Sequence, residues 1–256
     1  MAELERTSEK SKKPKNMSAE IVGTSLFHHI LNRRMILSAR EEMKSLLHRL
    51  IFVGKISPEL ADKRDLAEYW EEMFQNVQRY YQGEGITGLL LIYPSYVIHI
   101  LESSCDVLYS VIRDLKDMQK QGNRALILEP RILVVSHDIP TRLFYHWSYK
   151  VLNLTARWLG DISSNEPVER IVNDCLALLL KLGKHLQSSP KNSRVVPDSL
   201  IDKVPELIVP QDTIKHLLDR NELLTPEKFL QAYDSPLNIV MDSERVWPSP
   251  VHIAPV

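Results

Sequence analysis

Cysteine and histidine side chains are the residues of this sequence best suited to chemistry, and their spacing does not form a known motif. His28 and His29 are adjacent, so on a helix they would point about 100° apart and could not share a metal ion. Cys105 and Cys175 belong to no CxxC pair, which argues against a disulfide framework. Cys105 follows two serines at a predicted helix start, and Cys175 lies on an apolar stripe. We therefore expect ordinary thiols and no metal site.

Three patterns that resemble catalytic motifs fail in their context. The stretch GEGITG (83–88) matches GxGxxG, but a predicted helix precedes it and a strand follows, the reverse of a dinucleotide-binding turn. Acidic pairs such as Glu71–Glu72 lie on predicted helices among basic residues, as solvated faces do. The loop GKISPELADKR (54–64) lacks the glycine-rich phosphate cradle of an acylphosphatase. We predict that the chain is not an enzyme.

The charge balance argues against nucleic acid and membranes as partners. The chain has 32 basic and 33 acidic side chains, so it creates no long-range field that would attract a polyanion. Its most apolar helical stretch (175–183) is too short to span a bilayer and contains Lys181. The polar N-terminus lacks the apolar core expected of a signal peptide, and the cysteine usage fits a reducing compartment. We expect a cytoplasmic protein without a membrane span.

The pattern of apolar residues predicts a mixed α+β domain over 48–154. Amphipathic helices are predicted at 65–82 and 106–121, and their apolar positions recur every three or four residues. Strands are predicted at 48–56, 86–93, 96–102, 125–136 and 143–154. The order strand, helix, strand, strand, helix, strand, strand (βαββαββ) predicts a ferredoxin-like sheet with two helices on one face.

The second face of this sheet also needs a cover. Both alternating sets of side chains along YVIHILE (96–102) are mainly apolar, which indicates burial on both faces. A helix at 165–187, with Asn165 as its capping residue, is one candidate cover. A second copy of the chain, in a homo-oligomer, or another protein are the alternatives.

The remaining segments are expected to be peripheral. Residues 1–20 are polar and predicted to form a disordered arm, and 21–47 a helical lead-in. Residues 188–256 are predicted to contain a linker, short helices at 211–221 and 225–233, and an extended tail.

Four stretches resemble the BLUF domain, a blue-light sensor that uses flavin. They are HRLIFVGK (48–55), GITGLLLIY (85–93), YVIHILE (96–102) and FYHWS (144–148). The resemblance implies that a first-strand tyrosine, a third-strand glutamine and asparagines late in the first helix contact the flavin. This sequence has Phe52 at the tyrosine position, His99 at the glutamine position, and Tyr80 and Tyr81 at the asparagine positions. The position of a late methionine is Tyr149.

These replacements predict a degenerate flavin site without a cofactor. A phenylalanine has no hydroxyl, and a tyrosine cannot offer the paired donor and acceptor of an amide. We expect Phe52, Tyr80 and Tyr81 to fill the former cavity. We expect His99 to be a buried histidine hydrogen-bonded to Tyr80, Tyr81 or Trp147.

Two functions remain open on the sequence alone. The first is a non-catalytic module that binds other proteins, whose identity the sequence does not give. The alternative is a sensor that keeps a flavin or another planar ligand between the two helices, with Trp147 and His99 at its edge. The whole chain also resembles a protein of male germ cells, which implies a place in sperm as a scaffold component of the flagellum.

Overall fold

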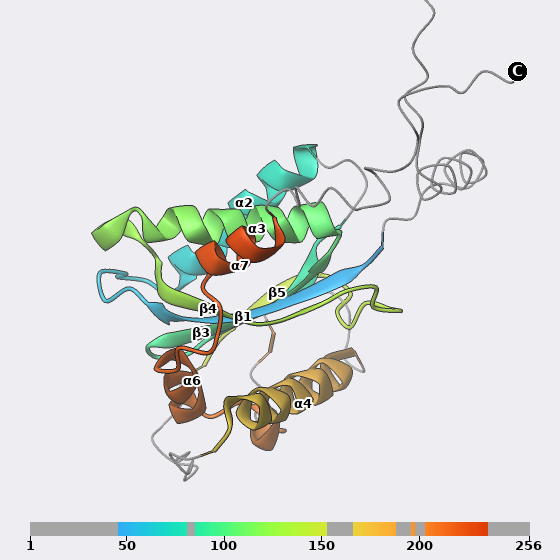
Figure 1. The fold of residues 1–256 in the computed structure, drawn as a ribbon. Helices are drawn as coiled ribbons and strands as arrows, with labels where there is room; N and C mark the ends of the chain where they lie inside the picture. Colours follow the sequence, from blue (N-terminus) through green and yellow to red (C-terminus); the bar gives the residue numbers. More distant parts are fainter. Residues whose placement is uncertain (1–45, 81–84, 153–165, 188–195, 198–202, 235–256) are drawn as a thin grey trace, which may run out of the picture. The chain divides into compact units, whose positions relative to one another are not determined.

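A five-stranded sheet separates two layers of helices (Figure 1). This computed structural model describes residues 46–80, 85–152, 166–187, 196–197 and 203–234, which all belong to one unit, Lys44–Pro236. Every neighbouring pair of strands is antiparallel except β2 and β5, which are parallel. In spatial order the strands are β4 (Ile127–Ser136), β1 (His48–Ile56), β3 (Tyr96–Ser103), β2 (Thr87–Ile92) and β5 (Trp147–Val151).

The helices lie on both faces of this sheet (Figure 1). One face carries α2 (Arg64–Tyr80), α3 (Cys105–Gln119) and α7 (Pro226–Tyr233). The other carries α4 (Val168–Gln187) and α6 (Gln211–Leu218), and two short 3-10 turns are η1 (Gly122–Arg124) and η2 (Pro205–Leu207). The chain order β1-α2-β2-β3-α3-β4-β5 confirms the predicted α+β, ferredoxin-like fold.

The first face differs from the prediction by one helix. Two helices were expected there, but α7 from the C-terminal part of the chain packs beside α3 as a third. The Phe229 ring lies 5.9 Å from the Tyr109 ring, and Arg113 makes an ion pair with Asp234 at 2.9 Å. The sequence of a short amphipathic helix shows its apolar stripe, but it does not show which surface that stripe packs against. The position of α7 therefore could not be predicted.

Burial of β3 on both faces divides the core into two clusters. Val97 and Leu101 face the cluster under α2 and α3, whereas Ile98 and Ile100 face the cluster under α4 and α6. Successive side chains of a strand alternate between faces, so one apolar strand can serve both clusters.

The structure places α4 over the second face of the sheet. Its Ile171, Cys175 and Leu179 are buried in the same cluster as Ile98 and Ile100. A homo-oligomer through that face would have to displace this helix. The predicted capping residue, Asn165, lies outside the described residues.

Gly183 lies inside α4, whose predicted end at residue 187 is confirmed. A Cβ atom at position 183 would overlap the Leu143 side chain, so the glycine allows that side chain to reach the helix backbone.

Two predicted boundaries need correction. β5 begins at Trp147 and not at Leu143, because the backbone N–H groups of Leu143 and Phe144 donate to a buried carboxylate instead of a neighbouring strand. β4 begins at Ile127, after η1. The predicted arm (1–20), most of the lead-in (21–47) and the tail beyond 234 lie outside the described residues.

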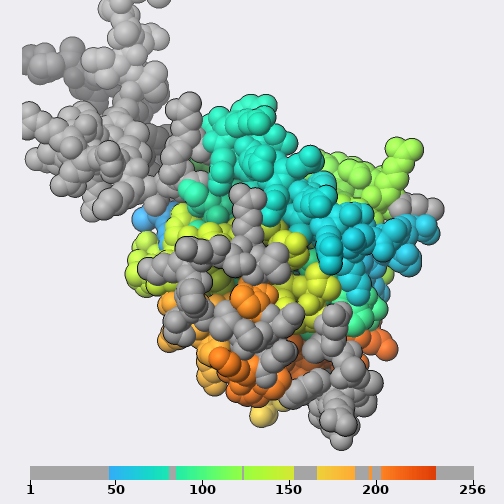
Figure 2. Space-filling model, turned by 180° about the vertical axis from the view of Figure 1, so that it is seen from behind, coloured from blue at the N-terminus to red at the C-terminus, as the bar shows by residue number. Residues whose placement is uncertain are grey.

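The edge of the sheet formed by β5 is visible from behind. Figure 2 shows the yellow surface of this strand between the cyan-to-green α2 above and orange segments of the later chain below. The backbone N–H of Val196 donates to the carbonyl of Tyr149 at 3.1 Å, so a later segment covers part of this edge.

Gly88 is the position where this sheet requires a glycine. Its φ is +157°, and it pairs with Leu101 on β3 and Trp147 on β5. A Cβ atom here would overlap the backbone carbonyl of Ile100, which cannot move without breaking the pairing of two central strands.

Gly88→Ala is therefore expected to lower the free energy of unfolding by at least about 3 kcal/mol, the upper end of overpacking costs, because backbone must move. Urea denaturation followed by circular dichroism measures this. Gly85→Ala is the matched control, since none of the described residues beyond its chain neighbours lies within 4 Å of a Cβ built there. It should leave stability unchanged or raise it by up to about 1 kcal/mol. Equal losses in the two variants would contradict this account.

Candidate functional site

Aromatic rings enclose His99 in the layer between α2 and the sheet. His99 is fully buried on β3, directly opposite Phe52 on β1. Its ring centroid lies 5.2 Å from that of Phe52 and 4.9 Å from that of Trp70. Phe74 and Trp147 lie at 6.1 and 6.0 Å. We call these four residues the His99 cage; two come from α2 and two from strands.

A hydrogen bond sets the tautomer of His99, and burial keeps its ring neutral. The indole Nε1–H of Trp147 donates to His99 Nε2 at 2.9 Å. This nitrogen is therefore an acceptor, and a neutral ring carries its proton on Nδ1. Burial lowers the pKa of His99 to about 3, because the charged imidazolium would lose its hydration. The ring is thus neutral at physiological pH.

Two nitrogen atoms at this site have no hydrogen-bond partner among the described residues. They are Nδ1 of His99 and Nε1 of Trp70, and both are buried. Unpartnered buried donors are uncommon in folded proteins, so these two atoms mark the site as unusual.

The structure brings together some of the residues predicted for this site. Phe52 and Trp147 each contact His99, and the Tyr149 ring lies 6.1 Å from that of Trp147. The expectation that Tyr80 fills the cavity is wrong: it is 86% exposed at the last residue of α2, beyond the buried stripe of that helix. Tyr81 lies outside the described residues.

Trp70 and Phe74 pack against His99, although neither was predicted for this site. Their rings are 5.7 Å apart, one helical turn from each other on the buried face of α2. The signal for them is in the sequence, because residues at i and i+4 share a helix face.

The residues at the flavin positions do not fit a flavin ring. Phe52 offers no polar atom, and the Nε2 atom of His99 is already bonded to Trp147. Tyr80 is too exposed to reach a buried ligand.

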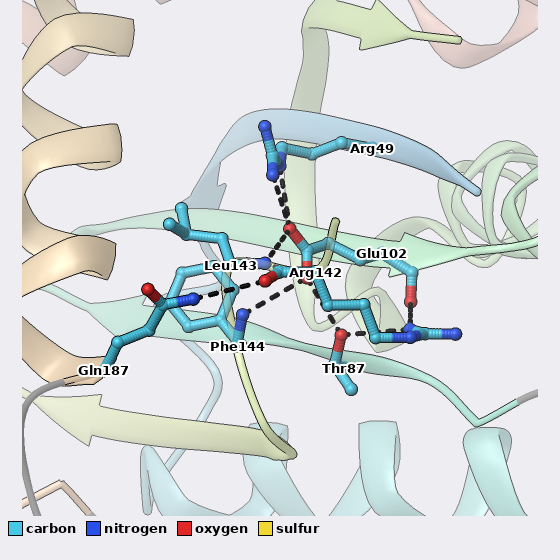
Figure 3. Close-up of polar contacts among 7 residues, drawn as sticks. All are labelled: Arg49, Thr87, Glu102, Arg142, Leu143, Phe144 and Gln187. Atoms are coloured by element: carbon cyan, nitrogen blue, oxygen red, sulfur yellow. Dashed lines mark hydrogen bonds and ion pairs between the residues drawn. The ribbon is translucent and has the colours of Figure 1, made fainter. Parts of the chain in front are cut away.

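Glu102 forms a second buried polar centre, at the end of β3 (Figure 3). Arg49 on β1 donates from Nε and Nη2 to Glu102 Oε1 at 2.9 and 2.7 Å. Thr87 on β2 donates its hydroxyl to Oε2 at 3.0 Å. The backbone N–H groups of Leu143 and Phe144 donate to the same carboxylate at 2.9 and 3.3 Å. One side chain thus joins three strands to the segment that leads into β5.

Neighbouring groups extend this network to α4 (Figure 3). Arg142 donates from Nη1 to the Thr87 hydroxyl at 3.0 Å and to the backbone carbonyl of Glu102 at 2.8 Å. Gln187, the last residue of α4, donates its amide to the carbonyl of Arg142 at 3.2 Å. No role was predicted for Glu102 from the sequence, although an acidic residue at the end of an apolar strand is a visible signal for a buried ion pair.

Comparison with known proteins identifies a family and a group of solved structures. The family model described as testis-expressed protein 47 matches residues 46–235. The dark-state structure of BlrB, a BLUF protein, is 18% identical with a TM-score of 0.31, covering 42% of this chain and 73% of that one. The BLUF structure of BlrP1 is 18% identical with a TM-score of 0.32, covering 51% and 76%. A bacterial light-regulated adenylyl cyclase is 22% identical with a TM-score of 0.33, covering 55% and 36%.

Glu102→Gln is expected to destabilise the fold strongly. The amide leaves the Arg49 guanidinium, 13% exposed, without its counter-charge, and removal of one partner of a buried pair typically costs about 3–5 kcal/mol. Urea denaturation measures the loss. Asp117→Asn makes the same acid-to-amide change in the exposed pair with Lys120 and should have no measurable effect. Wild-type stability of the Glu102→Gln variant would show that the network is not structural.

Stability should also fall in acid because of His99. The pKa is 6.5 for a free imidazole and about 3 in the folded protein, so between these values the unfolded state binds more protons. Between pH 6 and pH 4 the wild type should lose about 2 kcal/mol more than His99→Gln, which cannot titrate. Urea denaturation of both proteins across this range provides the comparison. Parallel pH profiles would mean that His99 is not held neutral.

Proposed function

The chain belongs to the family of testis-expressed protein 47, and from this membership and the site geometry we propose that it is a non-catalytic structural or protein-binding module. It is built on a BLUF-like domain that has lost flavin photochemistry. It carries no flavin, and its surface rather than a cofactor performs its function.

The His99 cage is the observation that carries this proposal. Phe52, Trp70, Phe74 and Trp147 surround His99 with ring centroids 4.9–6.1 Å away, a spacing at which aromatic rings are in contact. Side chains thus occupy the position where the resemblance would place the flavin ring. His99, at the position of the third-strand glutamine, accepts a hydrogen bond from Trp147 and is held neutral.

The state of the nucleophilic side chains supports a non-catalytic role. Burial raises the pKa of the Cys175 thiol to about 12, and it also raises the pKa of Cys105, with a contribution from Asp106. A thiol with a raised pKa is mostly protonated at neutral pH, and the protonated form is a poor nucleophile. The Tyr69 hydroxyl donates to the Asp114 carboxylate at 2.7 Å and joins α2 to α3, which is a structural use of both groups.

The proposed partners are other proteins. A net charge of −1 offers no general attraction for nucleic acid, and none of the described helices has the length and hydropathy needed to cross a bilayer. The words "testis-expressed" in the family's description favour male germ cells. We place the module in the cytoplasm of these cells, as a scaffold component of the sperm flagellum.

One observation favours a second candidate, a sensor of a planar ligand. The buried donors His99 Nδ1 and Trp70 Nε1 have no partner among the described residues. A flavin or another flat molecule with an acceptor atom between α2 and α3 would satisfy them. This candidate requires the cage rings to move apart.

Absorption spectroscopy separates the two candidates. The full chain is produced with flavin supplied and purified by gel filtration, with the BLUF protein BlrB treated in parallel as the positive control. We expect a flavin band from the control and a colourless sample from this chain. A flavin band at one equivalent per chain would overturn the proposed function and establish the second candidate.

A further inference from the structure

The register of the sheet brings two histidines and a cysteine to one end of it. His48, the first residue of β1, pairs with Ser103 at the end of β3, and Cys105 follows two residues later as the first residue of α3. On the other side of β1, Arg49 pairs with Ser136, the last residue of β4, so His137 comes next. The start of β1, the start of α3 and the end of β4 therefore lie beside one another, although they are distant in sequence.

The potential ligand atoms of these three residues converge. One nitrogen of each histidine and the Cys105 sulfur all lie within 4.8 Å of one another. The Nδ1 atoms of His48 and His137 are 3.0 Å apart, and their rings meet edge to face at 73°. Two nitrogens bound to one tetrahedral zinc at about 2.0–2.1 Å would lie about 3.3 Å apart, so the pair needs little adjustment.

The close approach of the histidines is fixed by the backbone around them. His48 is buried, and the backbone N–H of Asp138 donates to its Nδ1 at 3.4 Å, a long hydrogen bond that a metal ion at this atom would replace. Asp138 has a left-handed backbone, with φ +52°, in the turn that carries His137. An L-residue in this region costs free energy, so the fold specifies this turn rather than leaving it free.

We propose that His48, Cys105 and His137 form a zinc-binding site. Two imidazoles and one thiolate are ligands that suit zinc, and they would leave a fourth position for a water molecule or another ligand. The ion would join the start of β1, the start of α3 and the residue after β4. The site shares no residue with the His99 cage, so this inference holds whether or not the proposed function is correct.

Cobalt(II) is the probe for this site, because a thiolate bound to it gives a near-ultraviolet charge-transfer band and a tetrahedral ion gives visible bands. The full chain is treated with a chelator, kept reduced with a phosphine, and titrated. We expect both bands to saturate at one equivalent and to disappear when zinc(II) displaces cobalt. Zinc should also raise the melting temperature, since it binds the folded state.

Variants assign the ligands. Cys105→Ser should abolish the charge-transfer band, whereas Cys175→Ala, which removes the other thiol, should retain it. His137→Gln should weaken cobalt binding by more than the roughly 10–100-fold that loss of a supporting contact costs. His137 is exposed, so this variant should fold even where a change at the start of α3 does not.

Three results would overturn the zinc site. They are an absence of the charge-transfer band in the wild type, its persistence in a folded Cys105→Ser variant, and unchanged cobalt affinity in His137→Gln. Any of these would leave His48 and His137 as a hydrogen-bonded pair with no metal.

Discussion

The buried carboxylate of Glu102 is the interaction on which the arrangement of this domain depends. A carboxylate without hydration is tolerated only when charged and hydrogen-bonding partners surround it, and here they come from β1, β2 and the segment before β5. Each partner must be in place for the others to be stable, so the pairing is cooperative. The ion pair with Arg49 also aligns the start of β1 with the end of β3.

Both candidate sites depend on this alignment. The segment held by Glu102 continues into β5, where Trp147 lies within hydrogen-bond distance of His99. On the other side, His48 precedes Arg49 and therefore lies beside Ser103 and the start of α3. The Glu102 centre holds the ends of β1, β2 and β3 together. The aromatic rings of the His99 cage therefore fill the interior without having to set the strand register.

Much of the fold was predictable because β3 and its neighbours have strong local patterns. The strand predicted at 48–56 has the bounds of β1, and the aromatic face of α2 was visible in the spacing of Trp70 and Phe74. The site was predictable only in part. Phe52, His99 and Trp147 were named, but Tyr80 was placed inside and is exposed. The sequence does not show at which residue a helix ends, so it does not show whether a side chain in the last turn is buried.

The sequence by itself determined the strand and helix order and the two-sided burial of β3, because these follow from periodicity and side-chain type. Only the tertiary structure decided which partner His99 bonds, how Glu102 is neutralised, and that His48, Cys105 and His137 meet. These contacts join residues far apart in the chain, and strand register and loop paths bring them together. The pattern within one strand shows which side chains share a face, but it does not show which residue of another strand lies opposite.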